Sequence, residues 1–310
     1  MRNAFAAAIT ACAAADRRIV LLSGDIGNRL FDAFKDRFPD RFFNCGVAEA
    51  NMTGMAAGMA MCGLRPFTYT ITPFATTRAL EQIRVDICCH NVPVVIVGTG
   101  SGLSYASLGP THHSCEDVAL LRALPNMTVV CPADAAEVRA AVAAVLQVAG
   151  PVYLRLGKKG EPAVHREEPR FVVGKGIVLC EGRSVCLLGM GNMVATALEA
   201  ATLLEPSGLS ARVVSMHSVK PLDEDLLGEV FQRFPIVAVV EEHSRIGGLA
   251  GAIAEWLAAQ SPRPPGRLLA FATPDAFLEE SGSQQDARER FGLTAGAIAE
   301  RIQQARGAAC

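Results

Sequence analysis

Glu49 is the only charged residue in a long stretch of small and apolar side chains, GVAEANMTGMAAGMAMCG, which runs from Gly46 to Gly63. This stretch predicts a buried helix. Burial disfavours the charged form of a carboxylate, whereas a helix N-terminus favours it, so Glu49 is suited to hold or share a proton. The alternative is a core glutamate that pairs with a distant arginine.

Two adjacent histidines, His112 and His113, stand in the Gly/Pro-rich segment that begins at Gly109. Imidazole can donate to a developing alkoxide or relay a proton near neutral pH. The pair supplies two metal ligands without a clear third, so no metal site is predicted in this chain. Simple surface residues remain the alternative.

Short apolar, β-branched runs alternate with helical stretches in the first half of the chain. The predicted strands are Ile19 to Leu22, Pro93 to Val97, Met127 to Cys131 and Val152 to Leu156, and Ala135 to Val148 is a predicted helix. Continuous apolar strands are typical of a parallel sheet that helices cover on both faces. The first half therefore predicts a doubly wound α/β domain.

The charged, Gly- and Pro-rich segment GKKGEPAVHREEPR interrupts this pattern after Leu156. We place a first domain at 1–160, a linker at 161–175 and a second domain at 176–310. Three further strands, Ser184 to Leu188, Ala211 to Ser215 and Ile236 to Glu241, predict a smaller α/β domain after the linker.

Ala50, Gly54 and Gly58 recur every four residues in the predicted helix that bears Glu49. This spacing puts them on one helical face without side-chain bulk, so another backbone can approach closely. The helix is expected to pack against a partner.

The composition excludes several classes of protein. A formal net charge of -2 and 6% aromatic residues give no basic stripe with interleaved rings, which argues against nucleic-acid binding. The Ala-rich N-terminal run is broken by Asn3 and Thr10 and meets Asp16, so neither a secretory signal nor a membrane span is expected. Ten cysteines without a CxxC pair indicate reduced core residues in a cytoplasmic protein.

Three segments in combination resemble a known family. They are GVAEANM from Gly46, TTRALEQIR from Thr76 and GPTHHSCEDVALLRALPNM from Gly109, and VVEEHSRIGGLAGAIAE in the second half is similar to the same family. The chain resembles the smaller subunit of split transketolases, which carries the pyrimidine-binding and C-terminal domains. The 1-deoxyxylulose-5-phosphate synthases and the beta subunits of 2-oxoacid dehydrogenases are related to it.

This resemblance implies thiamine diphosphate as cofactor. The family residue that matches Glu49 hydrogen-bonds the pyrimidine nitrogen opposite the exocyclic amine and so favours the imino form that removes the thiazolium proton. Phe74 matches the phenylalanine that stacks on the aminopyrimidine, although a lone phenylalanine is usually a core residue. Arg78, in the same segment, is assigned to the cofactor site.

The resemblance also assigns substrate contacts. His112 matches a histidine that faces the reacting carbon, and His113 is a second catalytic candidate shared with the deoxyxylulose phosphate synthases. Arg155 lies where the family places an arginine on the sugar phosphate, with a salt bridge at the domain joint as the alternative. The motif-like His243, in EEHSRIGG, has no assigned chemistry.

Two positions depart from the family pattern. Leu108 stands where an acidic residue usually recognises a substrate hydroxyl, and Gly100 stands where a histidine helps to hold phosphate. Both are counted as substrate-site positions. Their loss of polar groups leaves open an unphosphorylated, differently substituted or less hydroxylated sugar.

The Gly-Asp-Gly motif that normally holds the diphosphate and its Mg²⁺ or Ca²⁺ does not occur in this chain. The chain is therefore expected to need a companion subunit with the diphosphate-binding domain, in an α₂β₂ assembly with sites between chains. The segment SGDIGN from Ser23 has the wrong spacing for that motif. It predicts a turn at the substrate mouth, where Asp25 or Asn28 contacts substrate.

The expected activity is transfer of a two-carbon ketol unit from a ketose to an aldehyde. A 2-oxoacid dehydrogenase beta subunit or a deoxyxylulose-type synthase is the alternative within thiamine chemistry. A non-catalytic α/β binding or scaffold protein is the alternative outside it.

Overall fold

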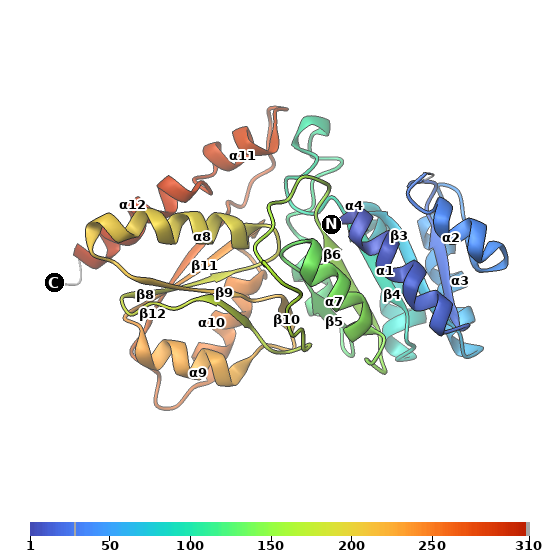
Figure 1. Ribbon diagram of the computed structural model, residues 1–310, viewed down its shortest axis with the longest axis horizontal. Coiled ribbons are helices and arrows are strands. Elements are labelled where there is room, and N and C mark those ends of the chain that lie inside the picture. The colour runs from blue at the N-terminus through green and yellow to red at the C-terminus, as the bar shows by residue number, and fades with distance from the viewer. Residues whose placement is uncertain (28, 308–310) are drawn as a thin grey trace.

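The computed structural model describes residues 1–27 and 29–307, and Figure 1 shows two sheets side by side, each between layers of helices. Both predicted α/β units are present, and the predicted fold class is confirmed. The helix predicted around Glu49 forms as α3, Glu49–Met61, and the helix predicted from Ala135 forms as α7, Ala135–Val145.

The first sheet has seven strands in the order β10, β5, β6, β4, β3, β1, β2, and only the pair of β10 with β5 is antiparallel. Its strands β1, β4 and β6 are buried along their whole length, as their continuous apolar runs predict. The bounds are β1 Ile19–Ser23, β2 Phe42–Asn44, β3 Arg65–Ile71, β4 Val95–Thr99, β5 Thr128–Val130, β6 Val152–Leu156 and β10 Ser218–Lys220.

Helices cover both faces of this sheet. Helices α1, Arg2–Ala15, α2, Asp32–Arg37, and α7 bury Phe5, Phe34 and Val142 on one face. On the other face, α3 and the π-helix η3, Ile83–Cys89, bury their apolar sides. Shorter helical segments are η1 Pro39–Arg41, α4 Thr72–Ala75, η2 Thr77–Ala79, α5 Leu80–Gln82, η4 Ala106–Leu108 and α6 Asp117–Arg122.

The second sheet has the order β12, β11, β8, β9, β7, with only β7 antiparallel to its neighbour. Helices α8 and α12 cover one face, and α9 and α10 cover the other (Figure 1). The bounds are β7 Ile177–Cys180, β8 Val185–Gly189, α8 Met193–Leu204, η5 Glu205–Ser207, β9 Ala211–Ser215, α9 Glu224–Arg233, β11 Ile236–Ser244, α10 Leu249–Ala259, β12 Arg267–Thr273, α11 Gln284–Arg290 and α12 Ala295–Gly307.

A single hydrophobic cluster runs through both halves of the chain. It joins Leu22 and Met52 of the first sheet and its helix to Val214 and Leu249 of the second. Strand β10, which follows β9 in the sequence, pairs with β5 at the edge of the first sheet. The two sheets are therefore packed together over an apolar joint.

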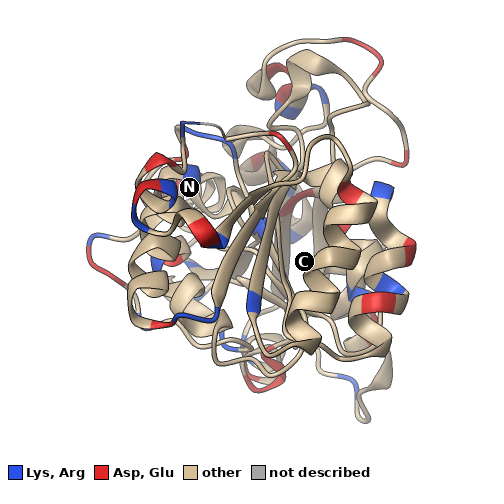
Figure 2. Ribbon diagram, turned by 90° about the vertical axis from the view of Figure 1, so that its right-hand side faces the viewer, with Lys and Arg blue, Asp and Glu red and all other residues tan. Residues whose placement is uncertain are grey.

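Charges of both signs are intermixed along the loops and helices seen in Figure 2, in agreement with the nearly balanced composition. Within the described residues, no helix combines the length and apolar character that a bilayer span requires. The nine cysteines in this part of the chain are free thiols.

Candidate functional site

The polar candidates gather where the parallel strands of the first sheet end. Strands β1, β3, β4 and β6 all run in one direction, so the residues after Ser23, Ile71, Thr99 and Leu156 meet at one edge of the sheet. This edge is the usual place for ligands in open α/β sheets. The fold therefore positions segments that are far apart in the sequence around one site.

Glu49 is the first residue of α3, and the residue is only 2% exposed. Its Oε2 atom accepts a hydrogen bond of 3.0 Å from Nη1 of Arg78. A buried carboxylate requires such a partner because leaving water costs it several kcal/mol. The arginine that the sequence left open as an alternative partner is thus Arg78, a residue assigned to the same site.

Phe74, Arg78 and His112 form one contiguous surface beside Glu49. The guanidinium carbon of Arg78 lies 4.1 Å from the centroid of the Phe74 ring. The rings of Phe74 and His112 meet edge to face, with centroids 5.3 Å apart. The structure therefore brings Glu49, Phe74, Arg78 and His112 together from α3, α4, η2 and the loop after η4.

Gly24 and Thr70 line the same place and were not singled out from the sequence. The Thr70 hydroxyl is buried and has no hydrogen-bond partner among the described residues. A β-carbon at Gly24 would stand 3.0 Å from that hydroxyl oxygen and 3.6 Å from Cγ of Glu49. Only glycine leaves this space open, and its position two residues after the predicted strand Ile19 to Leu22 was the available signal.

Tyr105 occupies the space beside Gly100. The glycine has a φ of +72°, and a β-carbon there would overlap the Tyr105 ring. The ring centroids of Tyr105 and His112 are 6.1 Å apart. Leu108, at the end of η4, is 51% exposed. An aromatic ring and an exposed leucine thus stand where the family pattern has polar side chains.

Lys158 is a further candidate that the sequence reasoning missed. Its ammonium lies 4.2 Å from the centroid of the Tyr105 ring, two residues beyond the end of β6. Partial burial, with Arg2 and Lys159 nearby, lowers the pKa of this amine. The signal in the sequence was a lysine just past the carboxyl end of a predicted strand, where ligands bind.

In the structure Arg155 makes the salt bridge that was the stated alternative, and it does not face an open substrate site. The residue is 3% exposed, and its Nε and Nη2 atoms donate to both carboxylate oxygens of Asp117. Burial alone would raise the pKa of Asp117, but the charge and hydrogen bonds of Arg155 hold it below its usual value. Nη2 of Arg155 also donates to the carbonyls of Ser114 and Glu242. Arg155 therefore belongs to the joint between the two sheets, which was the stated alternative.

His113 does not share the position of His112. Its ring is buried with Nε2 3.4 Å from the carbonyl oxygen of Ala106, and it lines a cavity of about 330 Å³ with Leu103, Cys115 and Phe291. Burial lowers the pKa of this imidazole, which favours the neutral ring. The structure thus separates His113 from the surface of Phe74, Arg78 and His112, and its catalytic role stays a prediction.

Of the two remaining predicted contacts, Asp25 and Asn28, the structure describes only Asp25. Asp25 is exposed, has a φ of +54°, and accepts a hydrogen bond of 2.9 Å from the Asn44 amide. This contact links the turn after β1 to the segment before α3. Asn28 lies outside the described residues. Within them, no group of His, Cys, Asp and Glu side chains is arranged to hold a metal ion.

Residues 1–161 match the family described as transketolase, pyrimidine binding domain, and residues 174–298 match the transketolase C-terminal domain. The two matches cover most of the chain. The chain belongs to the transketolase family.

Two relatives and one solved structure match over most of their length. The 6-deoxy-6-sulfo-D-fructose transketolase subunit of Clostridium sp. (strain MSTE9) is 38% identical over 95% of this chain and 91% of its own. An apulose-4-phosphate transketolase subunit of Phocaeicola vulgatus is 34% identical over 85% of each chain. A split gene transketolase, solved as an inactive beta4 tetramer, is 41% identical with a TM-score of 0.88, covering 98% of this chain and 96% of that one. This chain is accordingly similar to subunits of split transketolases, and the predicted enzyme class, a transketolase-like transferase, is confirmed.

Proposed function

We propose that this chain supplies the pyrimidine side of a thiamine diphosphate site and transfers a two-carbon ketol unit between sugars once a companion subunit completes that site. The observation that carries the proposal is the buried carboxylate of Glu49, set beside the Phe74 ring and within the same surface as His112. The alternative of a non-catalytic binding protein does not explain why Glu49, Phe74 and His112 lie together.

The residues present fit the aminopyrimidine part of the cofactor. A flat N–H donor is accommodated between Phe74 and Glu49, because the Arg78 guanidinium makes both of those contacts. The Gly24 backbone leaves room beside Glu49, and the Thr70 hydroxyl there has no hydrogen-bond partner among the described residues. Bound thiamine diphosphate would supply the nucleophilic carbon that ketol transfer requires.

Each side chain then has a defined task. Glu49 holds a proton at the ring nitrogen that faces its carboxylate, and Phe74 orients the ring through its face. His112 donates to the oxygen that becomes an alkoxide when the substrate carbonyl is attacked. We assign Arg78 to the cofactor site as the group that neutralises Glu49 until the ring is bound.

The companion subunit would hold the diphosphate and its Mg²⁺ or Ca²⁺, since this chain lacks the motif for both. Its docking surface includes Val47 and the face of α3 that carries Met55, Gly58 and Met61, all exposed. An exposed apolar face of this kind is typical of a protein interface. We propose an α₂β₂ enzyme in the cytoplasm, in keeping with free thiols throughout the described residues.

The substrate is proposed to be a sugar with an anionic end and few hydroxyl groups near Leu108. Lys158 offers one flexible ammonium for the anion, while Tyr105 and Leu108 offer no carboxylate or imidazole for hydroxyl groups. Both relatives are named for sugars with such an end, a sulfonate in one and a phosphate in the other.

The test is co-expression with the companion subunit, titration with thiamine diphosphate and a screen of ketose donors against aldehydes. We expect cofactor binding that needs both chains, and turnover of ketoses that end in a sulfonate or a phosphate. Pyruvate consumption would favour the synthase or dehydrogenase alternative. Failure of the assembled enzyme to bind the cofactor would overturn the proposal.

A further inference from the structure

Glu242, in β11 of the second domain, has a carboxylate that joins segments from both halves of the chain. The residue is fully buried, and its Oε1 accepts a 2.6 Å hydrogen bond from the backbone N–H of Leu103. The side-chain amide of Gln284 donates to both oxygens, and Nε of Arg288 donates to Oε2 at 2.8 Å. One carboxylate thus ties α11 to the loop that carries His112.

The two chain segments at the base of that loop, around Gly102 and around Ser114, both lie against β11. Gly102 and Ser114 exchange backbone hydrogen bonds of 2.9 and 3.0 Å, and the N–H of Ser244 donates to the carbonyl of Cys115 at 2.6 Å. A β-carbon at Gly102 would stand 2.8 Å from both the carbonyl oxygen and Oε1 of Glu242. Only glycine permits this approach.

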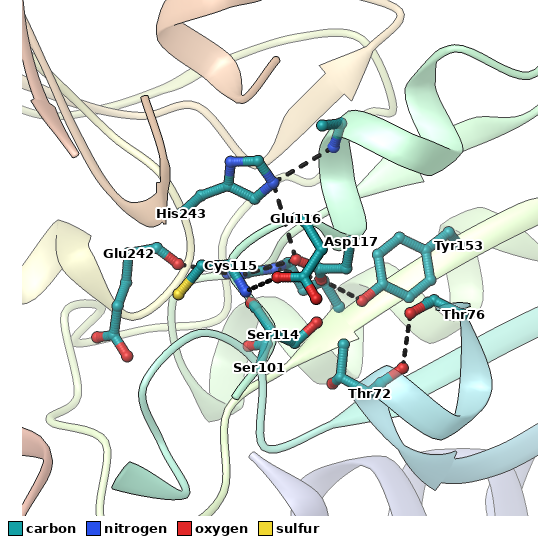
Figure 3. A network of polar contacts seen from close by, with 12 residues as sticks. Thr72, Thr76, Ser101, Ser114, Cys115, Glu116, Asp117, Tyr153, Glu242 and His243 are labelled. Atoms are coloured by element: carbon teal, nitrogen blue, oxygen red, sulfur yellow. Dashed lines mark hydrogen bonds and ion pairs between the residues drawn. The ribbon is translucent and has the colours of Figure 1, made fainter. Parts of the chain in front are cut away.

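Figure 3 shows how the two sheets meet at this point. The side chain of Glu242 points away from His243 and Asp117, which lie on the other side of the loop base with Tyr153. His243 accepts a hydrogen bond from the backbone N–H of Ala119 at 3.3 Å, and burial lowers its pKa to about 4. The imidazole is therefore neutral at pH 7 and belongs to the fixed part of the joint.

Helix α11 also touches the loop through apolar side chains. Ala287 packs in a small cluster with Leu103 and Ala106, and Leu278 from the segment before α11 completes it. In Figure 1 α11 lies beside the loop, away from the main body of the second sheet. The helix therefore meets the loop through this cluster, through Glu242 and through a 3.5 Å hydrogen bond from the Gln284 amide to the Ser104 hydroxyl.

We propose that Glu242 and Arg288 are positioning residues that hold the loop bearing Tyr105, Leu108 and His112 in its substrate-binding position. The second domain then sets substrate affinity through the ion pair between β11 and α11. The proposal rests on the proposed function for the role of His112, but the anchoring of the loop can be measured without catalysis.

The experiment compares Arg288→Met with Arg290→Met in the assembled enzyme. Arg290 lies on the same helix and pairs with Glu280 outside this network, so it is the matched control. We expect hydrogen exchange at the amides of residues 102–113 to accelerate about tenfold in Arg288→Met alone. The KM for sugar substrate should rise about tenfold with kcat within about twofold. Cofactor affinity should stay at the wild-type value, because Glu49 and Phe74 lie outside this network.

Glu242→Gln is the second variant, because it keeps the size of the side chain while removing its charge. It should accelerate exchange in the same residues. Arg288→Lys keeps the positive charge that Arg288→Met removes, so it should retain most of the wild-type protection. Equal exchange in Arg288→Met and Arg290→Met would overturn the proposal. So would a loss of cofactor affinity and unfolding stability in step with the change in KM, since that pattern indicates a general structural role. Should the wild-type enzyme bind no cofactor, the proposed function fails, while exchange still decides whether α11 anchors the loop.

Discussion

Glu49 has one ionic partner among the described residues, Arg78, whose side chain is 45% exposed while that of Glu49 is 2% exposed. The carboxylate is fixed below the surface, and the cation that neutralises it lies on the solvent side. A group that enters from solvent therefore meets the arginine first and the acid behind it. This geometry suits a carboxylate that a ring entering from solvent reaches once it displaces the arginine.

Glu49→Gln should lower kcat of the assembled enzyme by at least ~10²-fold, the scale of general acid–base catalysis. Glutamine keeps the size of the side chain but holds no transferable proton. Steady-state kinetics at saturating thiamine diphosphate measure the effect. Glu81→Gln is the control, because the carboxylate of Glu81 is exposed and lies 3.8 Å from Arg84. Turnover near the wild-type value in Glu49→Gln would contradict the assignment.

Lys158→Met should raise KM for a sugar with a sulfonate or phosphate end by about tenfold, because one hydrogen bond to a charged group is worth roughly 1.5–3 kcal/mol. The KM for an uncharged ketose should stay the same. Lys159→Met is the control, since Lys159 is the exposed neighbour in the sequence. Equal increases in KM for charged and uncharged substrates would show that Lys158 does not bind the sulfonate or phosphate group.

At the scale of the element, α3 combines a buried face with an open one. Met52, Ala56 and Ala60 pack into the core, whereas Gly58 has nothing within 4 Å of a β-carbon built on it. The close backbone approach that the Gly54 and Gly58 spacing predicts is not made within the described chain. This open face is the one that we propose for the companion subunit.

Gly58→Leu should leave the isolated chain at least as stable, because leucine is a better helix former than glycine by up to about 1 kcal/mol. It should weaken assembly with the companion subunit at least about tenfold, since a bulky side chain would enter the interface. Analytical ultracentrifugation measures both species. Gly228→Leu in α9, where a β-carbon also meets nothing within 4 Å, is the control. Unchanged assembly of Gly58→Leu would remove α3 from the interface.

At the scale of the whole molecule, the joint between the sheets contains buried imidazoles. His217 stacks on Phe171 of the linker with centroids 3.8 Å apart, and its Nε2 has no partner among the described residues. Burial lowers the pKa of His217 to about 4. The linker is thus packed against a neutral histidine.

Acid should therefore destabilise the joint. Below pH 6.5 the unfolded chain protonates His217, whereas the folded chain keeps it neutral down to about pH 4. As the pH is lowered through that window, this residue reduces the free energy of unfolding by up to about 1.4 kcal/mol per pH unit. Urea unfolding at pH 6.5 and pH 5 should show a loss about 1.5 kcal/mol smaller in His217→Phe than in wild type, because the unfolded imidazole is already half protonated at pH 6.5. The exposed His90→Asn variant is the control, and an equal acid loss in wild type and His217→Phe would refute this account.

The fold class and part of the site could be predicted because their signals are local. The apolar runs predict the buried strands, the lone acid in a small-residue helix identifies Glu49, and the missing diphosphate motif predicts a companion chain. Gly100 and Leu108 were recognised as departures, but the sequence did not reveal that Tyr105 fills the space beside Gly100. That contact joins residues five apart through a loop whose course no periodicity defines.

Only the tertiary structure separates the surroundings of Arg155 and Lys158, two cations three residues apart in one segment. Arg155 lies within a strand that is buried on both faces, so its charge has to be met by a protein carboxylate, and the fold brings Asp117 to it. Lys158 lies past the end of that strand, where water and ligands reach it. The order of the residues determines which groups are available and how each segment folds. Which charge is neutralised inside and which is left for a ligand depends on the groups that distant segments bring within a few ångströms.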